Sequence, residues 1–245
     1  MGRRNVRVGK NTTGGIAMRY IQKGKTPESL IQYAKNKNAY FDGYPDKDDV
    51  REQLLKNQGY LCGYCMRRLN SATEVKIEHI LPQSKLKDYP RKALDYKIML
   101  GVCYGNERKN SEGKKRHLQE LTCDAHRKDE DLKVADPYNK TCIEKIRYEA
   151  DGRITSDDPE LKEDLEDTLN LNYNGESAFL MENRKEVLAA CKDKMRRMKE
   201  RGQWTKTFLR KILKEYEEPD ELGYLKPYSG IAIWYLKKRL GEEKT

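Results

Sequence analysis

The stretch LCGYCMRRLNSATEVKIEHILPQS, residues 61–84, decides the fold. It opens with Cys62 and Cys65, and this spacing on a tight turn can direct two thiolates at one cation. Cys103 and Cys123 can supply two further thiolates, which would close a tetrahedral zinc site. Two alternatives stay open: the first pair acts as a redox dithiol, or Cys103 is a buried apolar residue.

The second half of the same stretch carries the residues suited to catalysis. Val75 and Ile77 alternate with polar residues, which predicts a strand that reaches Glu78 and His79. Neighbouring side chains on a strand point to opposite faces, so Glu78 and His79 can serve one site only at a strand end or turn. Pro82 follows shortly after and is expected to end the strand. A carboxylate can hold an oxygen-seeking cation against a phosphate, and a neutral imidazole can deprotonate water. The alternative for His79 is a buried, hydrogen-bonded structural histidine.

The composition limits the classes of protein to which this chain can belong. The 245 residues are 36% hydrophobic and 37% charged, with a net charge of +10, which raises the expectation of a polyanionic partner such as nucleic acid. No run approaches the roughly 18 apolar residues of a membrane span, and no apolar signal segment follows Met1. We therefore expect a cytoplasmic protein without membrane contact, in which disulfides are not expected.

Periodicity divides the chain into three regions. Residues 1–56 are expected to form a basic arm and helices, 57–137 the metal-bearing core, and 138–245 a hairpin followed by helices. The hairpin is predicted between Ile143 and Ile154, around an Asp-Gly turn.

Several ordered motifs resemble the HNH, or ββα-metal, endonucleases, and most closely the PtuB-like nucleases of the Septu and retron anti-phage systems. The resemblance covers roughly residues 18–240. The motifs are LCGYCMRR at 61–68, IEH at 77–79, LDY at 94–96, MLGVC at 99–103, TCDAH at 122–126, ITS at 154–156, LNLN at 169–172 and YSGIAIWYL at 228–236.

This resemblance implies an α+β fold: a ββα-metal HNH core with four-cysteine zinc knuckles, flanked by helices and a helical C-terminal region. It implies His79 as the general base and Glu78 as a ligand of the catalytic cation. It also implies that the structural zinc ligands are Cys62, Cys65, Cys103 and Cys123.

The last ligand of the catalytic cation stays open between Asp124 and His126. An aspartate favours Mg²⁺, whereas a histidine favours a softer cation such as Mn²⁺. The sequence departs from the family at Ile98, where an asparagine that braces the loop is usual. This departure bears on the order of that loop and on the level of activity.

A polar insertion, residues 104–121, separates the last two cysteines. Its cations, Arg108, Lys109, Lys114, Lys115 and Arg116, are expected to touch the backbone of a nucleic acid, with a solvated surface loop as the alternative.

The resemblance implies a metal-dependent endonuclease, with DNA as the favoured substrate and RNA as the alternative. It also implies a PtuA-like ATPase partner of the SMC/ABC type, docked on residues 155–245, where Tyr224, Tyr228, Trp234 and Tyr235 are either aromatic anchors or core residues. The competing hypothesis is a non-catalytic, zinc-stabilised module that binds nucleic acid or serves as an adaptor.

Overall fold

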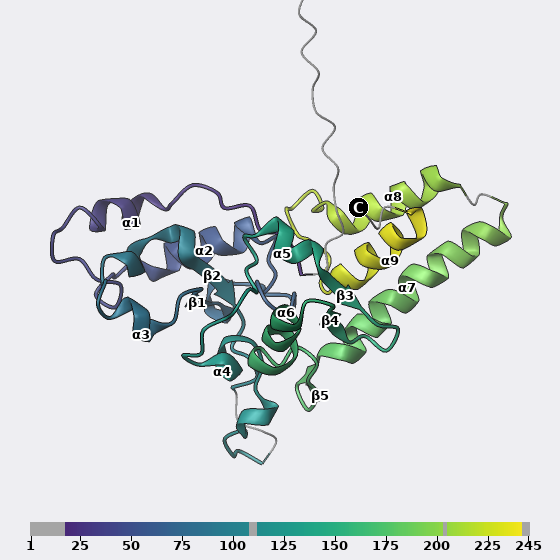
Figure 1. The fold of residues 1–245 in the computed structure, drawn as a ribbon. Coiled ribbons are helices and arrows are strands. Elements are labelled where there is room, and N and C mark those ends of the chain that lie inside the picture. Colours follow the sequence, from purple (N-terminus) through teal and green to yellow (C-terminus); the bar gives the residue numbers. More distant parts are fainter. Residues whose placement is uncertain (1–17, 108–111, 203–204, 242–245) are drawn as a thin grey trace, which may run out of the picture.

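The computed structural model describes residues 18–107, 112–202 and 205–241 (Figure 1). Most of the expected N-terminal basic arm therefore lies outside the described residues. The helices are α1 (Glu28–Tyr33), α2 (Lys47–Asn57), α3 (Gln83–Leu86), α4 (Cys123–Arg127), α5 (Lys140–Glu144), α6 (Pro159–Glu163), α7 (Leu180–Glu200), α8 (Lys206–Glu217) and α9 (Gly230–Leu240). The strands are β1 (Lys76–His79), β2 (Met99–Val102), β3 (Ile146–Tyr148), β4 (Ile154–Ser156), β5 (Asn174–Gly175) and β6 (Ala178–Phe179).

The fold is mixed α+β, and its described strands form three two-stranded antiparallel sheets. β1 pairs with β2, so that Glu78 lies opposite Leu100 and His79 lies opposite Met99. Helix α3 lies between β1 and β2 in the chain, and α4 follows β2 after the insertion. None of the described helices is long and apolar enough to cross a lipid bilayer.

Helix α2 lies in the region expected to hold N-terminal helices, and its Val50, Leu54 and Leu55 side chains are all buried. Leu54 packs in a cluster with residues of α1 and β2. The buried amide of Gln58, just after α2, receives a hydrogen bond from the Gly101 N–H (2.8 Å) and donates one to the Gly101 carbonyl (2.7 Å). Helix α2 is thereby attached to the β1–β2 sheet.

The predicted hairpin is confirmed as β3–β4, with Ile146, Tyr148 and Ile154 buried. The following helix turns into one π-helical segment, residues Asp164–Thr168. The fully buried Asp164 carboxylate accepts three backbone N–H bonds of 2.8–3.0 Å from residues 133–135. This carboxylate therefore attaches the segment after α4 to the hairpin region.

The C-terminal helices form a second core around α9, which packs against both α7 and α8. Figure 1 shows α7 running away from the sheets and α8 running back, with α9 between the two. The largest core cluster extends from Met18 to Ile231, so it draws residues from all three regions expected from the sequence.

Candidate metal centres and catalytic site

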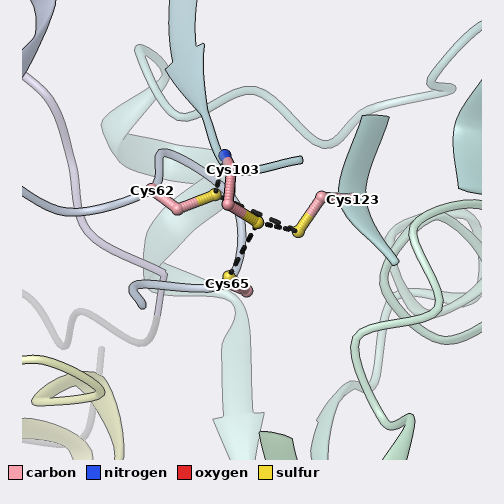
Figure 2. A group of neighbouring side chains, drawn as sticks. All are labelled: Cys62, Cys65, Cys103 and Cys123. Carbon is pink, nitrogen blue, oxygen red and sulfur yellow. Dashed lines mark hydrogen bonds between the residues drawn. The ribbon is translucent and has the colours of Figure 1, made fainter. Parts of the chain in front are cut away.

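The four cysteines expected to bind zinc converge on one point. Figure 2 shows the sulfur atoms of Cys62, Cys65, Cys103 and Cys123 turned toward a common centre. Cys65–Cys103 and Cys103–Cys123 are separated by 3.8 Å between sulfur atoms, Cys62–Cys123 by 4.0 Å, and all four lie within 4.8 Å of one another. A tetrahedral zinc with Zn–S bonds of about 2.3 Å needs S···S distances of about 3.8 Å, so these thiols could hold a structural zinc.

The same distances exclude disulfides, since a disulfide needs about 2.05 Å between sulfur atoms. All six cysteines are free, and Cys142 and Cys191 are buried outside the cluster. Burial acts to raise the pKa of the Cys62 thiol, but hydrogen bonds from Cys103 and Cys123 outweigh it and hold that pKa well below its usual value. Sulfur atoms that already share protons in this way are suited to exchange them for a cation.

Three segments distant in sequence supply the ligands. Cys62 and Cys65 lie on a turn closed by the Met66 N–H to the Cys62 carbonyl (3.0 Å). Cys103 directly follows β2, and Cys123 begins α4 with a positive φ of 55°. Positive φ is costly for a residue with a side chain, so a bound ion would help to hold α4 in this position.

Gly105 allows the segment that follows β2 to approach the start of α4 closely. Its φ is +54°, and its carbonyl accepts the Thr122 N–H at 2.9 Å. A Cβ at this position would lie 2.1 Å from the Thr122 carbonyl oxygen, so only glycine allows this close contact.

Two carboxyl groups meet beside the cysteine cluster. Glu78 from β1 and Asp124 from α4 line the same polar hollow, and Glu78 is only 9% exposed. Burial, followed by the neighbouring Asp124 carboxyl group, raises the pKa of Glu78 to about 9, although Arg127 opposes this shift. Paired carboxyl groups that are costly to ionise together are a suitable environment for a divalent cation.

Cations already surround this pair. The buried Arg127 donates to the Glu78 carboxylate and to the carbonyls of His79 (3.2 Å) and Ile80 (2.7 Å). Lys76 forms ion pairs with Asp124 (2.8 Å) and Glu107 (3.2 Å). Burial alone would lower the pKa of Lys76, but Asp124 and Glu107 outweigh it and raise that pKa. The site is therefore a compact network of opposite charges in which a cation would compete with Lys76 and Arg127.

A polar hollow of about 340 Å³ opens over this network, lined by Lys76, Ile77, Glu78, His79, Leu81, Pro82, Gln83, Glu107, Asp124, Ala125, Arg127, Lys128 and Asp129. It is the place where a phosphate group could reach the two carboxylates. Its lining mixes acidic and basic side chains, as a site for a cation together with an anionic substrate requires.

The His79 ring packs on the other face of β1 from the Glu78 carboxylate, as strand alternation requires. Its Nε2 lies 2.8 Å from the Ala93 carbonyl, and the ring meets Phe41 edge-on at 4.6 Å between centroids. Burial lowers the pKa of His79, although the bond to Ala93 opposes the shift, so the neutral imidazole is favoured. Since a carbonyl accepts only from a protonated nitrogen, this bond places the proton of the neutral ring on Nε2 and leaves Nδ1 as the proton acceptor.

His126 and Asp124 occupy different sides of α4. The Nδ1 atom of His126 hydrogen-bonds the Thr168 carbonyl at 3.0 Å, whereas Asp124 faces Glu78. Of the two residues left open by the sequence, the structure brings Asp124 to Glu78 and places His126 against the π-helical segment. At Ile98, the loop is closed by backbone, since the Ile98 carbonyl accepts the Ile80 N–H at 2.9 Å.

The cations of the insertion fall into three groups. Arg108 and Lys109 lie outside the described residues, and Lys114 and Lys115 are exposed. The Arg116 side chain is only 2% exposed and contacts Glu120 (3.5 Å) and Glu176 (3.4 Å). Arg116 therefore fastens the insertion to the β5–β6 hairpin.

The sequence prediction missed Lys76, Glu107, Arg127 and Tyr64 as members of the site. Lys76 stands two residues before Glu78, and strand alternation already places both on one face. Arg127 stands three residues after Asp124, a spacing that places both on one side of a helix. Tyr64, whose hydroxyl lies 3.5 Å from Glu78 and 3.3 Å from Arg127, had no such signal because its position depends on the cysteine turn.

Comparison with known proteins adds no relative from which a role could be transferred. No protein-family model matches the chain, and no curated protein is significantly similar to it in sequence. Function is therefore inferred from the residues and their geometry.

Proposed function

We propose that this protein is a metal-dependent endonuclease of the HNH type, with a structural zinc held by the four cysteines. The observation that carries the proposal is the convergence of the Glu78 and Asp124 carboxyl groups, from a strand and a following helix, in a polar hollow beside the cysteine cluster. A divalent cation, Mg²⁺ or Mn²⁺, bound between them would stabilise negative charge on the phosphate and its leaving oxygen.

Side chains of the protein would transfer the proton and bind the phosphate oxygens. The Ala93 carbonyl holds His79 in the tautomer whose Nδ1 can take a proton from water. Lys76, which already contacts Asp124, would turn toward phosphate oxygens if a cation took its place, while Arg127 would keep its bonds to the His79 and Ile80 carbonyls. Such contacts address the phosphate backbone and predict cleavage with little dependence on base sequence.

The resemblance to PtuB-like nucleases supports DNA as the substrate, a role in anti-phage defence and an SMC/ABC-type ATPase partner. Docking of that partner on residues 155–245 remains a proposal. Three of the four aromatic residues suggested as anchors make internal ring contacts: Tyr224 stacks on Tyr60 at 4.1 Å, Trp234 meets Tyr148 at 6.5 Å, and Tyr235 lies 5.3 Å from the Lys192 ammonium.

A second candidate function is a non-catalytic, zinc-stabilised nucleic-acid-binding or adaptor module. The contacts of Arg127 favour it, because its guanidinium bonds the Glu78 carboxylate where the cation would bind. The packing of His79 against Phe41 points the same way. In this alternative, Glu78 and His79 are structural.

Plasmid nicking with Mg²⁺ or Mn²⁺ separates the two functions, and it should be measured with and without the ATPase partner. We expect Asp124→Asn and His79→Ala each to reduce cleavage at least roughly 100-fold, because each removes a group that acts on the phosphate or on water. Matched controls are Asp88→Asn and His117→Ala, both exposed and outside the hollow, which should cleave at the wild-type rate. Wild-type cleavage by folded, zinc-loaded Asp124→Asn and His79→Ala proteins would refute the catalytic assignment.

A further inference from the structure

The net charge of +10 is distributed very unevenly along the chain. Residues 112–179, which include α4 to α6, contain 11 lysines and arginines and 18 acidic residues. Residues 180–241, which form α7 to α9, contain 16 lysines and arginines and only nine acidic residues. The C-terminal helices are therefore strongly basic, while the segment around α4 is acidic.

Nine exposed cations of these helices form no ion pair with any described residue: Lys192, Arg197, Lys199, Arg201, Lys206, Arg210, Lys211, Lys238 and Arg239. They lie on the second half of α7, at Arg201 just after it, on the first half of α8 and on the last turn of α9. We call this set the basic end.

The basic end is one region in space. Met195, Leu209 and Leu240, from the corresponding parts of α7, α8 and α9, pack in one apolar cluster. Figure 1 shows the C-terminal end of α7 and the start of α8 far from the β1–β2 sheet. The helix dipoles favour cations at the C-terminal ends of α7 and α9. They do not explain the cations on the first turns of α8, because the N-terminal end of a helix carries partial positive charge.

Two further features lie at the basic end. Lys192 of α7 and Arg239 of α9 each lie 5.3 Å from the centroid of the Tyr235 ring, so this aromatic ring is held close to two cations. A hollow of about 480 Å³ also lies along α7, lined by Ala190, Asp193, Lys194, Arg197, Met198 and Arg201. The surface is thus both concave and basic.

We propose that the basic end binds the phosphate backbone of duplex nucleic acid, independently of the candidate catalytic hollow. Helix α7 is about 31 Å long, whereas a duplex of about 30 base pairs extends roughly 100 Å. One duplex can therefore contact the basic end and still reach beyond it. The identity of the ligand rests on the proposed nuclease function, but binding and cleavage are measured separately.

The test uses the full chain with His79→Ala in every sample, so that the labelled duplex is not cut. Fluorescence anisotropy follows binding of the duplex over a range of salt concentrations without added divalent cation. The test variant carries Arg197→Gln, Lys199→Gln and Arg201→Gln. The matched control carries Lys37→Gln, Lys56→Gln and Lys87→Gln, which removes the same charge from exposed lysines on the N-terminal half.

We expect the test variant to bind roughly tenfold more weakly or worse, and its log–log salt slope to fall by about 2–3, because each lost phosphate contact removes about 0.9. The control should bind as its parent does. Equal binding by the test variant and the control would overturn the proposal, as would a parent protein that binds phosphatidylserine vesicles but no duplex. Salt-dependent binding that needs the basic end, with no cleavage by the wild type either with or without the ATPase partner, would uphold this inference and reject the nuclease function alone.

Discussion

Glu78 and His79 are neighbours in sequence, yet their side chains have different surroundings. Glu78 faces Tyr64, Asp124 and Arg127, whereas His79 packs on Phe41. Both residues line the same hollow because β1 ends at His79. A histidine at the last position of a strand can thus be anchored on one face and still border a site formed on the other.

Lys23 is a second residue whose environment has a measurable consequence. Its ammonium donates to the Met99 carbonyl and lies 3.9 Å from the Tyr96 ring centroid. Burial lowers the pKa of Lys23 to about 7, although Asp95 opposes this shift. The folded protein therefore binds fewer protons than the unfolded chain between about pH 7 and pH 10.5, and the Lys23 contribution to stability rises with pH in this window.

We predict that replacing Lys23 with methionine removes this rise. The free energy of unfolding, from urea titrations between pH 7 and pH 10, should climb more steeply for the wild type than for Lys23→Met. Lys25→Met, at an exposed neighbouring position, should run parallel to the wild type. If the free energy of unfolding of Lys23→Met also ran parallel to that of the wild type, Lys23 would be protonated in the folded state over this whole pH range, and the prediction would be wrong.

At the scale of elements, Arg127 joins α4 to β1. Its guanidinium reaches Glu78 and the carbonyls of His79 and Ile80, and it is only 1% exposed. We expect Arg127→Met to destabilise the fold by about 3–5 kcal/mol, because it leaves a buried acidic group and several carbonyls without their partner.

Thermal and urea unfolding measure this loss. The control is Arg196→Met, whose ion pairs with Asp193 (3.2 Å) and Glu200 (3.7 Å) are exposed and should contribute at most about 1 kcal/mol. If both variants lost the same stability, Arg127 would not be the link between the two elements.

Local rules predicted the elements better than they predicted the site. The helix at Val50, the β3–β4 hairpin and the C-terminal helices follow from apolar periodicity and turn residues. The choice between Asp124 and His126 depends on how a five-residue helix is rotated against β1, which sequence spacing alone does not determine. The β5–β6 hairpin was missed because each strand has only two residues.

At the scale of the whole molecule, the cysteine cluster joins segments separated by 61 positions, from Cys62 to Cys123. It connects the end of α2, the end of β2 and the start of α4, so the pairing of Asp124 with Glu78 depends on it. The C-terminal helices extend from this centre with a charge opposite to that of the α4 segment. The molecule thus separates its cysteine cluster and candidate catalytic hollow from its basic end.

The central claim is that one zinc ion, bound by four thiolates, holds these segments together. Native mass spectrometry of the purified protein, before and after exposure to a strong chelator, tests it most directly. We predict one zinc per chain in the wild type and in Cys142→Ser, and loss of zinc together with unfolding in Cys103→Ser and in the chelated wild type. A wild-type protein that contains no zinc and folds equally well with the chelator would contradict the account.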